Sequence, residues 1–243
     1  MTTTWHRFCV GFYYYLLFIG VTSALGKYLL PQDVHLWLAA LLGGSYAQHL
    51  PLLAEHSTDN VHRSVGALYL ILGMLQFMPA IRKHHPKLHR WCGRLFLILS
   101  VLAGMTGVLL SLIVSFGGSP EAIPAVVFAT AAVVCAIRAY LFARARRFRE
   151  HREWMIRTFA FGLGVSVIRL WFWAFVFMAP GMPHTISLVA AFWLGWISSL
   201  LGAEYWIRHT RRPLSTHLAA SVGFVELAQQ GAPADGLASR ARR

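Results

Sequence analysis

The sequence predicts an all-α integral membrane protein, a bundle of six transmembrane helices with both termini in the cytoplasm. The first observation is composition: of 243 residues, 57% are hydrophobic and 13% are charged, about half the charge of soluble domains. The second is the length of the apolar runs, because about 20 residues of helix cross a bilayer. The third is that basic residues gather in alternate connections, which orients the helices.

The apolar runs divide the chain into helices, and they lack the strict alternation of a membrane β-barrel. We expect helices at about residues 9–30, 62–81, 90–116, 121–144, 153–178 and 184–208. Together they form a membrane domain over residues 9–210. Residues 1–8 are then a cytoplasmic N-terminal segment, and residues 211–243 are a cytoplasmic tail, small and polar enough to be partly disordered.

The first run, residues 9–30, contains Lys27 as its only charge. It is longer than the apolar core of a signal peptide, about 7–15 residues, so we expect an uncleaved helix. The longest outer connection follows, over residues 31–60. Its apolar stretch is too short to span, and Asp33 and Trp37 suit a short helix that lies on the outer membrane surface.

Turn sequences and single charges mark the later helices. Glycine and proline in FGGSP (residues 116–120) and APGMP (residues 179–183) predict tight outer turns on either side of the fourth and fifth helices. Within the apolar part of the fifth helix Arg169 is the only charge, and Glu204 is the only one within that of the sixth.

The basic residues mark the cytoplasmic side. Five lie within residues 82–94, seven within 138–157 and six within 208–243, whereas the opposite connections hold only Lys27 and Arg63. This positive-inside pattern predicts the cytoplasmic side. The net charge of +13 therefore indicates orientation in a lipid bilayer, in the cell inner (plasma) membrane, and not nucleic-acid binding.

Three histidines each begin a stripe of small or polar residues along one helix face. The stripes run from His62 through Gly66, Tyr69, Gly73, Gln76 and Ala80, from His89 through Gly93, Phe96, Ser100, Ala103 and Gly107, and from His151 through Met155, Thr158, Gly162, Val165 and Arg169. Such faces point at other helices in a membrane, so the histidines are expected to face the bundle. The glycines of the two His-Arg-x-x-Gly motifs, Gly66 and Gly93, are expected to allow close packing.

These histidines are predicted to lie at helix ends. At a helix N-terminus the dipole favours neutral imidazole. Neutral imidazole can bind a metal or haem iron, or take up a proton. The commoner alternative is structural: a histidine at the membrane interface that hydrogen-bonds a neighbouring loop.

Two charged positions inside the membrane, like the histidines, could be either functional or structural. Arg169 falls near the middle of the bilayer, where a charge indicates function by default, although snorkelling or a structural hydrogen bond would also explain it. Glu204, near the inner end of the last helix, could pair with Arg157 or Arg94 as a structural ion pair or serve as a proton site.

The sequence contains no catalytic motif, since Walker loop, GxSxG, HExxH and Cys-x-x-Cys patterns are all missing. We therefore assign no catalytic residue. Cys9, Cys92 and Cys135 fall near the inner face or inside helices and are expected to be small packing residues. His84-His85 stands in a basic loop, and no metal site is predicted there.

Several longer motifs resemble one family. They are His62-x-x-x-Gly66, LGMLQFMP (residues 72–79), Arg82, Pro86, His89-Arg90-Trp91, Gly93-Arg94, HREWMIR (residues 151–157) and Arg169-Leu170. Over roughly residues 61–170, and more weakly at Ala203-Glu204, the chain resembles the domain of unknown function 2306 family of predicted bacterial multi-pass membrane proteins. The chain departs from the family at Ser198, where an asparagine is expected.

The resemblance implies a multi-helix protein of the bacterial plasma membrane and brings no activity with it. It also implies that some residues chosen by spacing coincide with the motif positions of the family. These are His62, His89, His151, Arg157 and Arg169.

The leading hypothesis is a non-enzymatic assembly or interaction factor that binds a membrane-protein partner or a second copy of itself. An alternative is a b-type haem protein that moves electrons across the membrane. Its axial imidazoles would come from two pairs: His89 with His151, and His62 with His184. Arg157 and Arg169 would neutralise the haem propionates. A third hypothesis is a small-solute or proton-coupled transporter, with Gln76, Arg169 and Glu204 lining the path.

Overall fold

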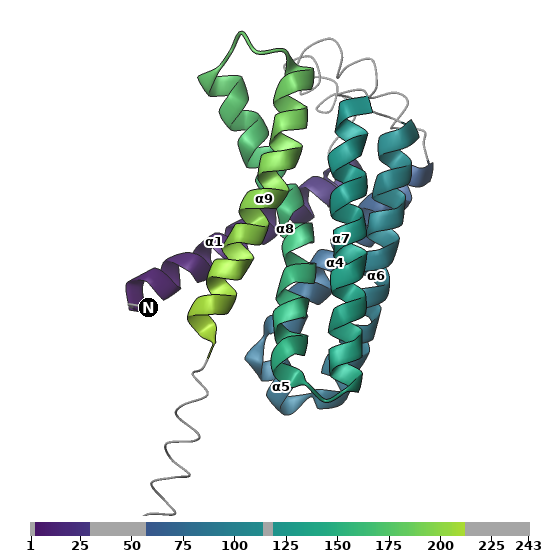
Figure 1. Cartoon of the computed structure of the whole chain (residues 1–243), viewed down its shortest axis with the longest axis vertical. Coiled ribbons are helices and arrows are strands. Elements are labelled where there is room, and N and C mark those ends of the chain that lie inside the picture. The colour runs from purple at the N-terminus through teal and green to yellow at the C-terminus, as the bar shows by residue number, and fades with distance from the viewer. Residues whose placement is uncertain (1–2, 30–56, 114–118, 212–243) are drawn as a thin grey trace, which may run out of the picture. The chain divides into compact units, whose positions relative to one another are not determined.

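The computed structural model describes residues 3–29, 57–113 and 119–211, and every element in these ranges is an α-helix (Figure 1). The helices are α1 (Thr3–Leu29), α4 (Ser57–Phe77), α5 (Pro79–His84), α6 (Pro86–Ile113), α7 (Ser119–Arg144), α8 (Phe148–Met178) and α9 (His184–Thr210). The predicted surface helix after residue 31 and the tail beyond residue 211 lie outside the described residues. The chain divides into two compact units, Met1–Ile207 and Arg208–Arg243.

Five of the described helices are long and apolar enough to cross a membrane. They contain the segments Thr4–Gly26, Pro86–Ile113, Pro120–Arg144, Phe148–Met178 and His184–Thr210. The other predicted span, residues 62–81, is divided into α4 and α5. The division follows from Pro79, which has no N–H to continue a helix, and Met78 before it is extended (φ −74°, ψ 118°). Asp59 and Arg63 in the first turns of α4 also make that helix less apolar.

Five of the described helices, α1, α4, α6, α7 and α8, begin earlier than the sequence predicts, and for two of them this changes the place of a histidine. Helix α6 begins at Pro86, four residues before the predicted start, and α8 begins at Phe148, five residues before it. Proline at a first helical position costs no hydrogen bond, because that N–H has no partner within the helix. His89 and His151 are therefore each the fourth residue of a helix. They lie about one turn into the helix, whereas the sequence predicted them at its very start.

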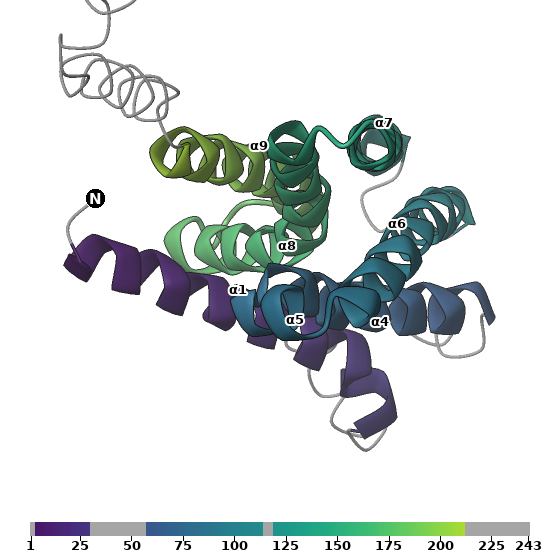
Figure 2. The same ribbon diagram turned by 90° about the horizontal axis from the view of Figure 1, so that it is seen from below.

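The core forms where α4, α6, α7 and α8 pack side by side, with α1 lying against α4 and α8 (Figure 2). Aromatic rings fill its centre. The ring of Tyr69 stacks on Phe96 with centroids 4.7 Å apart, and Phe96 meets Phe159 at 5.9 Å. Tyr69 and Phe96 belong to the predicted stripes, and both are buried. These faces of α4 and α6 do point into the bundle, as predicted.

Glycines make room for these rings, but not at every predicted position. A Cβ atom on Gly73 would lie 2.1 Å from the Phe159 ring, and one on Gly162 would lie 2.1 Å from the Tyr69 ring. Around Gly66, in contrast, no atom of the described residues lies within 4 Å of such a Cβ. The predicted close packing at Gly66 is therefore wrong. Helical spacing correctly placed Gly66 and Gly73 on one face, but it does not determine how closely a neighbouring helix approaches along that face.

Candidate functional site

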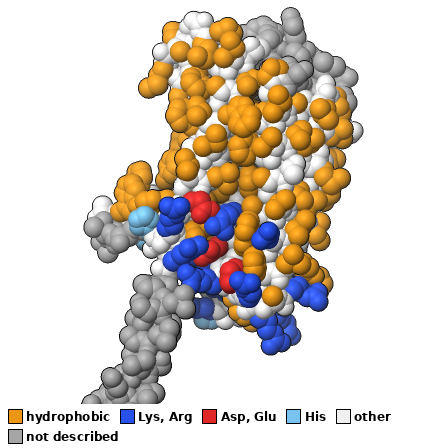
Figure 3. Space-filling model, viewed as in Figure 1, with side chains coloured by type: hydrophobic (Ala, Val, Ile, Leu, Met, Phe, Trp, Pro, Cys, Tyr) orange, Lys and Arg blue, Asp and Glu red, His pale blue; other side chains and the backbone are white. Residues whose placement is uncertain are grey.

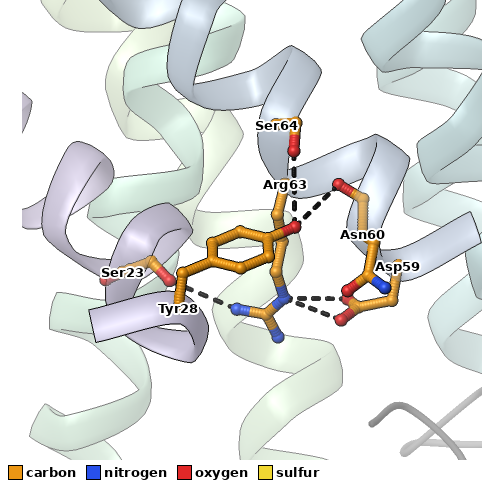
Figure 4. Close-up of polar contacts among 6 residues, drawn as sticks. All are labelled: Ser23, Tyr28, Asp59, Asn60, Arg63 and Ser64. Atoms are coloured by element: carbon orange, nitrogen blue, oxygen red, sulfur yellow. Dashed lines mark hydrogen bonds and ion pairs between the residues drawn. The ribbon is translucent and has the colours of Figure 1, made fainter. Parts of the chain in front are cut away.

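Polar side chains gather at both ends of the bundle. One end holds α5 and the connection between α7 and α8; we call it the α5 end. Figure 3 shows one face of the molecule, on which hydrophobic side chains cover the middle and charged side chains gather at the α5 end. At the opposite end lies the Asp59 cluster, defined here as Ser23, Tyr28, Asp59, Asn60, Arg63 and Ser64 (Figure 4).

An ion pair forms the centre of the Asp59 cluster. Arg63 Nε donates to both carboxylate oxygens of Asp59 at 2.9 Å, and Arg63 Nη1 donates to the Ser23 carbonyl of α1 at 3.2 Å. The Asp59 side chain is only 2% exposed and that of Arg63 is 29% exposed. Because the pair is one helical turn apart on α4 and reaches α1, it holds the end of α1 against the start of α4.

Tyr28 provides a second contact between the same two helices. Its hydroxyl donates to the Asn60 carbonyl at 3.1 Å and lies 3.3 Å from the Ser64 hydroxyl. The sequence analysis missed this network. The spacing of Asp59 and Arg63, four residues apart, is a signal that could have found the ion pair, whereas nothing in the sequence pairs Tyr28 with α4.

His62 links α4 to α6 at this end of the bundle. Its Nδ1 lies 3.0 Å from Thr106 Oγ1, and the Thr106 hydroxyl donates to the Leu102 carbonyl at 2.8 Å. Since the single hydroxyl proton is used in that bond, we assign the proton of this contact to His62 Nδ1. His62 thus faces a neighbouring helix, as predicted, and its contact is the structural kind.

Arg169 of α8 also contributes a charge near His62. It interacts electrostatically with His62, as Arg63 does, and its Nη1 donates to the Val165 carbonyl one turn earlier at 2.7 Å. The fold therefore brings together two positions, His62 and Arg169, that the sequence analysis chose separately. His62 therefore has one carboxylate, that of Asp59, and two guanidinium groups, those of Arg63 and Arg169, as electrostatic neighbours.

His89 and His151 form the histidine pair at the α5 end. They come from α6 and α8 and lie close enough to interact electrostatically. His151 Nδ1 donates to the Ala139 carbonyl of α7 at 2.8 Å, which leaves Nε2 of the neutral ring as the acceptor. His89 Nδ1 is buried and has no hydrogen-bond partner among the described residues. The pair therefore offers imidazole nitrogens that the helix contacts do not use.

Gln76 lies next to the histidine pair. Its Nε2 donates to the His89 carbonyl at 3.2 Å, and a Cβ on Gly93 would lie 3.0 Å from its Oε1. Gly93, unlike Gly66, is thus closely packed as predicted. Gln76 joins α4 to the start of α6 and is 5% exposed.

Arg157 and Glu204 join α8 to α9 near the α5 end. Arg157 Nε lies 2.5 Å from Glu204 Oε1, and Nη2 lies 3.1 Å from Oε2. The guanidinium also lies 4.8 Å from the centre of the Trp154 ring. The sequence offered Arg157 and Arg94 as partners for Glu204, and the structure pairs it with Arg157. The Arg94 guanidinium lies over the Trp91 ring. The haem hypothesis assigned the Arg157 guanidinium to a haem propionate, but here it is bonded to the Glu204 carboxylate.

The remaining predicted positions, His184 and Ser198, lie at the start and in the middle of α9. The His184 ring lies 6.3 Å from the Phe172 ring of α8, so His184 and His62 have different neighbours. Ser198, where the family resemblance led us to expect asparagine, accepts a hydrogen bond from Trp171 Nε1 at 3.2 Å. A serine can therefore serve as the acceptor that this tryptophan needs.

Long apolar helices joined by polar contacts define a multi-pass membrane protein. The family model described as predicted membrane protein, domain of unknown function 2306, matches residues 60–207, which is more than half of the chain. The chain belongs to this family. The match confirms the resemblance and covers α4 to α9. No curated protein and no solved structure matches the chain.

Proposed function

We propose that the chain is a non-enzymatic assembly or interaction factor of the bacterial plasma membrane. One observation supports this proposal: several polar side chains inside the bundle bond a neighbouring helix, as His62, His151 and Gln76 do. Side chains that bond a neighbouring helix stabilise the packing of the helix bundle. Interaction with another molecule then takes place at the surface of the bundle.

The proposed topology has six spans, with both termini in the cytoplasm. Helix α4 is the sixth span; with 21 residues it is long enough to cross the apolar layer, which needs about 20. Charged side chains gather at the α5 end (Figure 3), and the positive-inside rule makes this the cytoplasmic end. In this proposal the positive charge orients the protein in the bilayer, and the protein does not bind nucleic acid.

A row of aromatic residues on α1 is the proposed contact surface. Phe8 stacks on Phe12 with centroids 6.3 Å apart, and Phe12 meets Tyr15 at 6.4 Å. All three are exposed, at 60%, 45% and 51%. Their spacing of four and three residues places them on one face of the helix. The partner is a helix of another membrane protein or of a second copy.

Photo-crosslinking in cells tests this surface. A photoreactive amino acid at Phe12 is expected to give a protein adduct, whose mass distinguishes a second copy from another membrane protein. Ile98 of α6, which is 56% exposed, is the matched control and should react only with lipid. Lipid adducts alone at Phe12, or the same protein adduct from both positions, would contradict the proposal.

A second candidate, the b-type haem protein, is favoured by the histidine pair. Two imidazoles from different helices match the two axial ligands of a haem iron. A backbone carbonyl orients His151, which is how ligating histidines are commonly held. His89 Nδ1 lacks a partner among the described residues. The transporter hypothesis gains less support, because Gln76, Arg169 and Glu204 bond three separate groups: the His89 carbonyl, the Val165 carbonyl and the Arg157 guanidinium.

A reduced-minus-oxidised visible spectrum separates the two candidates. If the haem candidate holds, protein purified from cells supplied with a haem precursor shows a Soret band that His89→Ala and His151→Ala each remove. His84→Ala is the control, because His84 is exposed in the short α5. A colourless protein at full yield, or a band that survives both substitutions, would exclude ligation by this pair.

A further inference from the structure

One face of helix α6 is exposed along the whole helix; we call it the α6 lipid face. The helix packs on α4 and α7, whereas steps of four and three residues from Lys87 to Leu112 trace a face on which every side chain is exposed. The longer part of this face is apolar and consists of Ile98, Leu102, Met105, Leu109 and Leu112. In a membrane such a face lies against lipid.

The first turns of the α6 lipid face are basic and aromatic. They lie at the α5 end and present Lys87, Arg90, Trp91 and Arg94, all exposed. The Arg94 guanidinium lies 5.2 Å from the centre of the Trp91 ring. Arg90 and Arg94 are four residues apart, a spacing at which two like charges on a helix destabilise each other. An anion bound between them would relieve this repulsion.

The protein itself does not balance these charges. Helix α6 contains no acidic residue, and no carboxylate of the described residues forms an ion pair with Lys87, Arg90 or Arg94. Other arginines at the α5 end do have such partners, as Arg147 does in Glu150 at 2.6 Å. The basic turns of α6 are therefore complementary to an anion from outside the described chain.

We infer that the α6 lipid face binds an anionic phospholipid, with the phosphate between Arg90 and Arg94 and the acyl chains along the apolar part. Guanidinium groups match phosphate oxygens in geometry and charge, and the Trp91 ring suits the membrane interface. From Arg94 to Met105 the helix rises about 16 Å at 1.5 Å per residue. That is about half of the hydrocarbon layer of about 30 Å, the length that the chains of one leaflet fill.

Two other occupants fit this face less well. A soluble phosphate compound would use the basic turns and leave the apolar part without a role. Copies of the chain inserted in one orientation would bring their basic turns side by side, and these repel. The inference requires only that the chain spans a membrane. It depends neither on the contact surface of α1 nor on which side the α5 end faces.

Native mass spectrometry of the full chain in detergent micelles tests the inference. Phosphatidylglycerol, which is anionic, is expected to bind more tightly than phosphatidylcholine, which has no net charge. Arg94→Gln should weaken binding of phosphatidylglycerol about fivefold, the contribution of one basic residue at an anionic lipid surface, and change that of phosphatidylcholine little. Arg147→Gln is the matched control, because it removes the same charge at the same end from a residue that already has a carboxylate partner.

Arg90→Gln is the second variant and should act as Arg94→Gln does. Equal affinities of the two lipids for the wild type, or an equal loss in Arg147→Gln, would overturn the inference. Glycerol phosphate, the headgroup chemistry without chains, should not displace the lipid; if it does, the ligand is a soluble phosphate compound and the lipid assignment is wrong. A dimer that crosslinks through Ile98 and excludes the lipid would assign the face to a second copy.

Discussion

Gly195→Ala is expected to destabilise the protein by about 3 kcal/mol, at the upper end of the usual cost of overpacking. A Cβ at this position would lie 2.7 Å from the backbone nitrogen of Ile168 and 2.8 Å from its Cα. Backbone atoms of α8 cannot rotate away as a side chain can. Close helix contact through small residues is a main source of association in membranes, so α9 should separate from α8.

The measurement is reversible unfolding in mixed micelles. Gly202→Ala is the matched control, because it lies on the same helix and a Cβ there meets no atom of the described part of the chain within 4 Å. It should be neutral or slightly stabilising, since alanine has the higher helix propensity. Equal losses of stability in the two variants would show that close approach at Gly195 is not the cause.

Asp59→Ala is expected to cost about 3 kcal/mol, the lower end of the range for breaking a buried ion pair. The carboxylate is 2% exposed and the guanidinium of Arg63 is 29% exposed, so Arg63 would be left partly buried without its counter-charge. The contact with the Ser23 carbonyl of α1 should weaken with it. Unfolding free energy and protease sensitivity of the α1–α4 connection are the measurements.

A double variant tests the reason for that loss. Asp59→Ala combined with Arg63→Met should cost no more than Asp59→Ala alone, because no unpaired charge is left. Glu150→Ala removes the partner of Arg147 in an exposed pair and should change stability little. Additive losses at Asp59 and Arg63 would contradict a coupled pair.

The faces that the helices turn to the bundle could be predicted from spacing alone. Tyr69, Gly73 and Gln76 lie on the stripe that starts at His62, and all three are buried. The prediction succeeded because the period of a helix is a local property of the backbone. It failed at Gly66, where no described neighbouring helix comes close, because that distance depends on how two helices cross. It also failed at Ala80, which is exposed in α5 because the break at Pro79 ends the helical period.

The candidate site was predictable in its residue types but not in its contacts. Arg169 and His62 stood out as polar residues in apolar runs, yet nothing in the sequence brings them together. Arg157 had no local signal to choose Glu204, since that choice depends on the rotation of α8 against α9.

The sequence by itself determined that this is a helical membrane protein, where its long apolar segments lie, and which family it belongs to. Length, hydrophobicity and motif order are properties of the chain before it folds. The tertiary structure alone decided which groups meet: Arg63 with Ser23, His62 with Thr106, and Arg157 with Glu204. Those contacts depend on how the helices cross, which brings together residues far apart in the chain.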